Sequence, residues 1–268
     1  MDSTSIFGDT QPHQVVLFPF VSKGHTIPLP HLARLFLRRR LTVTIFTTPS
    51  NHPFISESLS DTTATILDLP FSHNVPDIPV GIESTDKLLS MSMFHSFANA
   101  TKLMQPDFER ALHTLPCVSF IVSDAFLWWT LESATKFNLN RFVYYGMSCY
   151  STSLITVVSH NRLLFGPESD DELITVTHFS WIKVTRNDFE PPFNEPEPKG
   201  LKHEFDMNML TAVANSYGII VVNVYYVLLW ALGPTAFFTC IAHLYFYYTL
   251  LVPHTYASYI RHWCIFFH

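Results

Sequence analysis

The residues best suited to acid–base chemistry in this chain are His25 and Asp124. His25 follows Gly24 just after a short apolar run, and Asp124 closes a second apolar run. A neutral imidazole accepts a proton from a hydroxyl group near pH 7, and a carboxylate on its other nitrogen fixes the tautomer and stabilises the imidazolium. We therefore predict that His25 is a base oriented by Asp124. The alternative is structural: His25 caps a helix or lines a loop, and Asp124 only ends a strand.

Aromatic side chains follow Asp124 in the sequence. Phe126, Trp128 and Trp129 are suited to wall a pocket for a flat apolar molecule, because small-molecule sites are mostly aromatic and aliphatic. The alternative is the ordinary packing of a helix against a sheet. The acidic run 169–172 is typical of a solvated loop, so we expect no metal site there. Neither a GxGxxG motif nor a P-loop motif occurs, which disfavours a dehydrogenase and a P-loop enzyme.

The elements that would position these residues alternate between strand and helix signals. Short apolar or β-branched runs predict strands at 14–20, 41–47, 65–69, 118–124 and 141–145. Apolar residues at helical spacing predict helices at 27–40, 87–98, 102–115, 128–137 and 148–164. After an exposed loop at 165–199, rich in proline and acidic residues, the pattern resumes with a helix at 201–216 and a strand at 218–223. This alternation is typical of an α/β fold, a doubly wound parallel sheet with helices on both faces.

The strand order of such a sheet decides where the site lies. In the common order 3-2-1-4-5, the chain reverses direction across the sheet between strands one and four. Open parallel sheets bind ligands beyond the carboxyl ends of the strands at that point. His25 follows strand one and Asp124 ends strand four. We therefore expect the two side chains to meet in this crevice.

The overall charge and the cysteines exclude several classes of protein. The 268 residues carry 16 Lys and Arg against 22 Asp and Glu, a formal net charge of −6 at pH 7, which disfavours a nucleic-acid binder. Four cysteines without a CxxC pair disfavour a zinc ribbon and a disulfide scaffold. Residues 1–12 are expected to be flexible. They contain no basic start and no long apolar run, so we expect no secretory signal and a cytoplasmic protein.

The composition changes sharply near residue 223. Of the basic and acidic residues only Arg261 lies beyond Asp206, and residues 218–253 carry no charge. Roughly 20 apolar residues suffice to span a bilayer, so membrane association through 218–253 is one alternative. We favour the other, in which residues 224–268 are an aberrant apolar tail, derived from translated intron or a shifted reading frame.

Several stretches resemble the plant UDP-dependent glycosyltransferases that act on small molecules. They are VVLFPF at 15–20, KGHTIP at 23–28, VTIFTTPSN at 43–51, VSDAFLWW at 122–129 and NSYGIIVVN at 215–223. The resemblance implies a GT-B fold, in which two Rossmann-like domains face each other across a cleft. It implies further that residues 13–223 are the N-terminal domain, which binds the acceptor.

The same resemblance implies a reaction. His25 matches the base that deprotonates an acceptor hydroxyl, and Asp124 matches the residue that orients this base. The hydroxyl attacks the anomeric carbon of a UDP-sugar with inversion and displaces UDP, without a cofactor or a metal. The expected acceptor-binding residues are Phe20, Phe126, Trp128 and Trp129.

The chain also departs from the family's pattern. The family continues with a C-terminal domain whose box, rich in Trp, His, Gly and Glu, binds the UDP-sugar, and no such box occurs here. We therefore expect a fragment that transfers sugar slowly or not at all by itself. Gly146 stands where many relatives have a threonine that reaches the donor sugar, and Arg40 replaces a glycine before the second strand. The alternative function is a non-catalytic binding module or a membrane-tethered fragment without a donor site.

Overall fold

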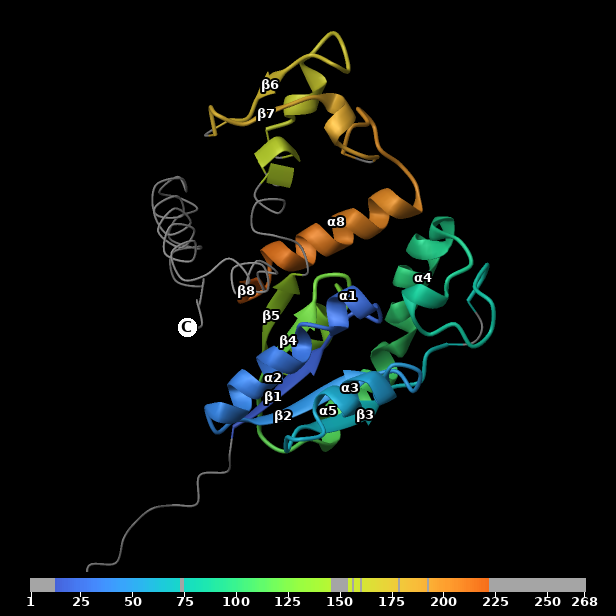
Figure 1. Cartoon of the computed structure of the whole chain (residues 1–268), viewed down its shortest axis with the longest axis vertical. Helices are drawn as coiled ribbons and strands as arrows, with labels where there is room; N and C mark the ends of the chain where they lie inside the picture. Colours follow the sequence, from blue (N-terminus) through green and yellow to red (C-terminus); the bar gives the residue numbers. More distant parts are fainter. Residues whose placement is uncertain are drawn as a thin grey trace, which may run out of the picture. The chain divides into compact units, whose positions relative to one another are not determined.

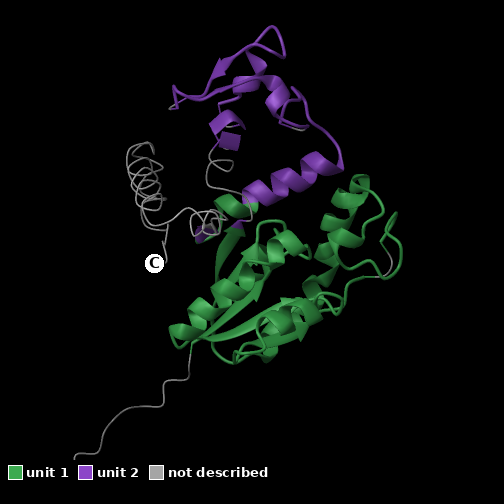
Figure 2. Cartoon of the chain, viewed as in Figure 1, with its two compact units in different colours: residues 1–144, 212–217 green, residues 145–211, 218–268 purple. Residues whose placement is uncertain are grey.

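The structure, a computed structural model, describes residues 13–72, 75–145, 154–155, 157–159, 161–177, 179–191 and 193–221. The chain divides into two compact units, residues 1–144 with 212–217 and residues 145–211 with 218–268 (Figure 2). The expected acceptor domain, 13–223, spans both units. Gly146 and the tail 224–268 lie outside the described residues.

A parallel sheet forms the centre of the first unit (Figure 1). Its strands are β1 (Gln14–Phe18), β2 (Thr42–Thr47), β3 (Thr65–Asp68), β4 (Val118–Asp124) and β5 (Asn140–Tyr145). They lie in the order β3-β2-β1-β4-β5, and each neighbouring pair is parallel. With β8 (Gly218–Val221) the sheet has six strands. The predicted α/β fold and its strand order are confirmed.

Helices follow the strands, but not all as the sequence predicts: a helix at 52–58 was not predicted, and the helix predicted at 87–98 begins only at Phe94. The helices are α1 (Lys23–Thr26), α2 (Leu29–Arg38), α3 (His52–Ser58), α4 (Phe94–Ala100), α5 (Gln105–Thr114), α6 (Thr130–Lys136) and α8 (Leu201–Ala214). Short 3-10 turns accompany them: η1 (Thr85–Lys87), η2 (Met91–Met93) and η3 (Thr101–Met104). In α2 the buried residues Leu29, Leu32, Ala33 and Phe36 recur at helical spacing, so one stripe of this helix packs against the sheet.

The end of α2 has a conformation that usually calls for glycine. The N–H of Leu41 donates to the carbonyl of Phe36 and the N–H of Arg40 to that of Leu37, at 3.2 and 2.9 Å. These two bonds make a Schellman motif, whose residue after the C-cap adopts the left-handed conformation. Arg40 is that residue, and its φ is 62°. Arg40 therefore adopts the backbone conformation that glycine usually adopts at this position of the motif.

The core of the first unit is aromatic around β1. Phe18 is fully buried, and its ring centroid lies 5.9 Å from that of Phe46, 5.3 Å from Phe108 and 5.8 Å from Trp129. Aromatic pairs at these separations stabilise the core beyond the area that they bury. Helices α5 and α6 thereby pack on the strand that leads to His25.

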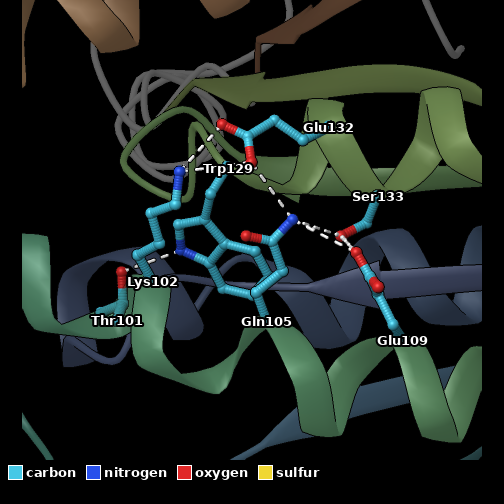
Figure 3. A network of polar contacts seen from close by, with 7 residues as sticks. All are labelled: Thr101, Lys102, Gln105, Glu109, Trp129, Glu132 and Ser133. Carbon is cyan, nitrogen blue, oxygen red and sulfur yellow. Dashed lines mark hydrogen bonds and ion pairs between the residues drawn. The ribbon is translucent and has the colours of Figure 1, made fainter.

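A network of polar contacts joins η3 and α5 to α6. Figure 3 shows its members, Thr101, Lys102, Gln105, Glu109, Trp129, Glu132 and Ser133. The indole N–H of Trp129 donates to Oγ1 of Thr101 at 3.1 Å, inside the core. The ion pair of Lys102 and Glu132, at 2.9 Å, is half exposed, and such surface pairs contribute little to stability. The buried contact is therefore the one that fixes the beginning of α6.

The second unit contains a small hairpin where the sequence predicted only an exposed loop, so that part of the prediction is wrong. Strands β6 (Ile174–Thr175) and β7 (Lys183–Val184) pair antiparallel, between the 3-10 turns η4 (Leu163–Phe165) and η5 (Arg186–Asp188). They pack in an apolar cluster formed by Val158, Leu164, Val176, Val184 and Phe189. Of the predicted helix 148–164, residues 148–153, 156 and 160 lie outside the described residues.

Within the ranges that the structure describes, no helix is long and apolar enough to cross a membrane. Of the stretch 218–253, on which the membrane alternative rests, only 218–221 are described.

Candidate functional site

His25 and Asp124 meet beyond the carboxyl ends of β1 and β4. Nδ1 of His25 lies 2.7 Å from Oδ2 of Asp124, a hydrogen-bond distance. The two strands are parallel neighbours, with Phe18 opposite Ser123, so they end at the same edge of the sheet. The proximity predicted from the sequence is therefore observed.

The backbone around His25 is held by the one-turn helix α1. The N–H of His25 donates to the carbonyl of Ser22 at 3.1 Å, and the hydroxyl of Thr26 donates to the same carbonyl at 2.9 Å. Lys23 forms an ion pair with Asp86 at 3.1 Å, which connects α1 to the segment around η1. The His25 side chain is 21% exposed, whereas that of Asp124 is 1% exposed. The imidazole therefore lies between the buried carboxylate and solvent.

Both oxygens of the Asp124 carboxylate have a partner. Oδ2 contacts His25, and Oδ1 accepts the N–H of Phe126 at 2.9 Å. The next residue, Ala125, donates its N–H to the carbonyl of Tyr144 on β5 at 3.0 Å. These bonds fix the carboxylate and the start of its turn before any ligand binds.

The environment raises the pKa of His25 above its ordinary value of 6.5. Burial is the largest single influence and lowers this pKa. The negative charge of Asp124 and its hydrogen bond act in the opposite direction and together outweigh burial. The pair therefore stabilises the imidazolium, which is the state that a base reaches after it takes a proton.

Two phenylalanine side chains contact the imidazole, and a third packs against both of them. The ring of Phe126 lies 4.9 Å from that of His25, and the buried ring of Phe20 lies 5.6 Å from it. Phe94 completes the group, 6.0 Å from Phe20 and 5.8 Å from Phe126. Of the residues predicted to bind the acceptor, Phe20 and Phe126 thus lie beside the imidazole, and Phe94 packs on both. We call Phe20, Phe94 and Phe126 the aromatic wall.

Relatives of this chain were found among plant proteins, although no family model matches it. UDP-glycosyltransferase 90A1 from Arabidopsis thaliana is 51% identical over 224 residues, which cover 81% of this chain and 47% of the relative. UDP-glycosyltransferase 90A2 from the same plant is 51% identical over 215 residues, covering 77% of this chain and 46% of that relative. The chain is a relative of the plant UDP-glycosyltransferases. It spans about half the length of the members that it matches.

Solved plant glycosyltransferases share the fold. Glycyrrhiza uralensis UGT73P12, complexed with glycyrrhetinic acid 3-O-monoglucuronide, aligns with a TM-score of 0.68 and 23% identity over 81% of this chain and 44% of its own. Arabidopsis thaliana UGT89C1, complexed with UDP-L-rhamnose, aligns with a TM-score of 0.57 and 21% identity over 81% and 43%. At these identities the likeness supports the fold alone, a Rossmann-like domain.

The two tryptophans predicted as acceptor-binding residues, Trp128 and Trp129, pack in other surroundings. Trp129 is fully buried in the phenylalanine core and bonds Thr101, while the ring of Trp128 lies under the ammonium group of Lys102, 4.4 Å away. Neither tryptophan is among the ring contacts that the structure gives for His25. For these two residues the structure matches the alternative, in which they pack a helix against the sheet. The difference follows from the turn after β4. Phe126 lies within this turn, whereas Trp128 and Trp129 lie immediately before α6.

Two polar residues near the pair were missed from the sequence. Burial lowers the pKa of Arg141 to about 10, against the opposing effect of the Asp124 charge. Burial, and then the charge of Asp124, raise the pKa of the Tyr144 hydroxyl, which has no hydrogen-bond partner in the described part of the structure. The sequence feature that could have identified Arg141 is its charge, which stands out in the otherwise apolar strand 141–145.

One of these solved glycosyltransferases, Arabidopsis thaliana UGT89C1, holds a UDP-sugar, UDP-L-rhamnose. Among the described residues no group of three or more His, Cys, Asp or Glu is placed to hold a metal ion. The site as described holds a histidine paired with a buried carboxylate, beside the aromatic wall.

Proposed function

We propose that this chain supplies the acceptor-binding half of a UDP-glycosyltransferase, which transfers a sugar to a hydroxyl of a small apolar plant metabolite. The observation that carries the proposal is the 2.7 Å contact of His25 with Asp124, at the edge of the sheet where the strand order reverses. The aromatic wall lies beside this pair and suits an apolar molecule. Half-length similarity to named glycosyltransferases supports the same reaction.

In the proposed mechanism Nε2 of His25 takes the proton of the acceptor hydroxyl, because Nδ1 is engaged by Asp124. The hydroxyl oxygen forms a bond to the anomeric carbon as the bond from that carbon to the UDP oxygen breaks. UDP leaves with the electron pair. A single displacement of this kind inverts the anomeric centre. Asp124 stabilises the imidazolium and holds the tautomer that leaves Nε2 able to accept a proton.

The nature of the acceptor is inferred from the wall and from related structures. Arabidopsis UGT89C1 was also solved with quercetin, and UGT73P12 with a glucuronide of glycyrrhetinic acid. Quercetin and glycyrrhetinic acid are both polycyclic molecules with hydroxyl groups. We propose that the acceptor here belongs to the same broad class, a rigid apolar molecule with a hydroxyl that reaches His25.

Donor binding is expected to need residues outside the matched half. Displacing UDP requires both reactants to be held in register and the charge on the leaving phosphate to be stabilised. We infer that a second domain supplies this surface in the active enzyme. The second candidate function is a binding module for the acceptor, which the aromatic wall beside His25 favours.

The proposal is tested with a joined protein, in which residues 1–221 of this chain are continued by the C-terminal half of Arabidopsis UDP-glycosyltransferase 90A1. We expect acceptor-dependent release of UDP from UDP-sugar across a panel of hydroxylated polycyclic acceptors. The His25→Ala variant should lose about 10²- to 10⁴-fold in rate, the usual contribution of a general base.

The matched control is His52→Ala. His52 contacts Asp68 at 2.7 Å, so it is also a histidine paired with a carboxylate, but it is not part of the aromatic wall. This variant should keep the parent's rate. Equal rates for the His25→Ala variant and the parent would refute the catalytic role. In calorimetry the unjoined chain should bind an acceptor but show no saturable UDP-sugar binding.

A further inference from the structure

A buried arginine holds the turn that carries Asp124. Arg141 lies on β5 and is 1% exposed. Its Nη2 donates to the main-chain carbonyl of Asp124 at 3.1 Å and to that of Leu127 at 3.5 Å. These carbonyls belong to the first and last residues of the turn, since the N–H of Leu127 also donates to the carbonyl of Asp124 at 3.1 Å. One planar guanidinium therefore fixes both ends of the turn.

The same guanidinium joins the flanking elements. Nε of Arg141 donates to the hydroxyl of Ser123 on β4 at 2.7 Å and to that of Thr130 on α6 at 2.9 Å. Nη1 donates to the hydroxyl of Ser216 at 2.8 Å. Successive side chains of a strand point to opposite faces of the sheet, so Ser123 and the carboxylate of Asp124 lie on opposite faces. Arg141 therefore supports Asp124 from behind, through its main chain.

Placing a cation at this position is costly, which is why a specific role is expected. The acceptors of the guanidinium among the described residues are hydroxyls and carbonyls, and none is a carboxylate. A buried charge without a paired opposite charge carries a large desolvation cost. A hydrophobic side chain would avoid that cost but would leave the carbonyls of the turn unsatisfied.

We propose that Arg141 is a positioning residue for the His25–Asp124 pair. By fixing the turn from Asp124 to Leu127 it also fixes the N–H of Phe126, which bonds the carboxylate at 2.9 Å. The carboxylate is then held where it selects one ring tautomer of His25, with the proton on Nδ1. This inference rests on the proposed function in one respect, that the His25–Asp124 pair is catalytic.

The test observes the tautomer directly, by NMR of the full chain labelled with ¹⁵N in its histidine rings, at a pH where the rings are neutral. The His25 signal is assigned by its loss in a His25→Gln variant. In the parent chain we expect one tautomer, protonated on Nδ1. In the Arg141→Met variant we expect this signature to change to a mixture of tautomers. His52 is the internal control, because its contact with Asp68 lies apart from the turn and reports that the chain is folded.

Each outcome decides the proposal. A changed His25 signal beside an unchanged His52 signal supports it, and an unchanged signal at both positions overturns it. If the Arg141→Met variant loses both signatures, the Arg141→Lys variant decides in the same way, because an ammonium keeps the charge but not the planar fork. Loss of both signatures in both variants means that Arg141 serves the fold alone, which overturns the proposal. The NMR experiment does not measure sugar transfer. A failure of the proposed function would appear in the assay of the joined protein and not in this one.

Discussion

At the scale of residues, the two members of the pair are fixed to different degrees. Asp124 is buried, has partners on both carboxylate oxygens and lies in a turn that Arg141 fixes at both ends. His25 lies on a helix of one turn and remains partly exposed. The carboxylate is thus the fixed reference and the imidazole the accessible group, an arrangement suited to a base that must meet a ligand from outside.

The raised pKa of His25 predicts how stability depends on pH. A group whose pKa is higher in the folded state stabilises the fold fully below its unfolded pKa, here about 6.5, and this contribution is lost as the pH rises through the higher folded value. Urea unfolding of the parent chain and of a His25→Gln variant, each at several pH values from 5 to 9, measures the difference. We expect the parent's advantage to be largest at acidic pH and to shrink as the pH rises. An advantage that grows with pH would contradict this.

At the scale of elements, the end of α2 positions β2 next to β1. The Schellman bonds turn the chain at Arg40, and β2 then pairs with β1 from Thr42 onward, opposite Gln14. The left-handed conformation at Arg40 is unfavourable for a residue with a Cβ atom. The backbone at Arg40 is therefore slightly strained, because the turn requires a positive φ at a residue that is not glycine.

Replacing Arg40 by glycine should relieve this strain. We expect Arg40→Gly to raise the free energy of unfolding by about 1 kcal/mol, because glycine adopts a positive φ without steric cost. Arg39→Gly is the matched control, since Arg39 has φ −88° and gains nothing from glycine. It should leave stability unchanged or lower it. The measurement is urea unfolding of both variants, and a stabilising effect at position 39 but not at 40 would contradict the explanation.

The sequence predicted the elements that have strong patterns and missed those set by tertiary contacts. Strand β4 and the crevice partners His25 and Asp124 were predictable because strand ends and strand order follow from periodicity and crossover rules. Phe94 could not be placed, because it reaches the site after a long irregular segment. The hairpin β6–β7 has only two residues in each strand, and its alternation of Ile174 with Val176 and Ile182 with Val184 is too short to stand out.

At the scale of the whole molecule, the candidate site belongs to one unit. His25, Asp124, the aromatic wall and Arg141 all lie within residues 1–144. The composition beyond residue 223 is of a different kind, with 14 aromatic residues among positions 224–268 and a single charge at Arg261.

Deleting residues 224–268 should therefore raise solubility and leave the sheet folded. Long uncharged aromatic stretches promote association, and 242–248 has the composition of an aggregation-prone segment. The measurement is the soluble fraction after expression, together with the cooperative unfolding transition of the shortened and complete chains. A shortened chain that is less soluble, or that loses its transition, would show that the tail is part of the fold.

The central claim is that His25 and Asp124 act as one catalytic unit, and a double-mutant cycle in the joined protein tests it most directly. The rate of sugar transfer is measured for the parent, His25→Ala, Asp124→Ala and the double variant, with folding of each checked by its unfolding transition. Residues that act as a unit show strongly non-additive effects. We predict that Asp124→Ala slows the parent but causes no further loss once His25 is alanine. An equal loss in both backgrounds would contradict the account, because the carboxylate would then act without the imidazole.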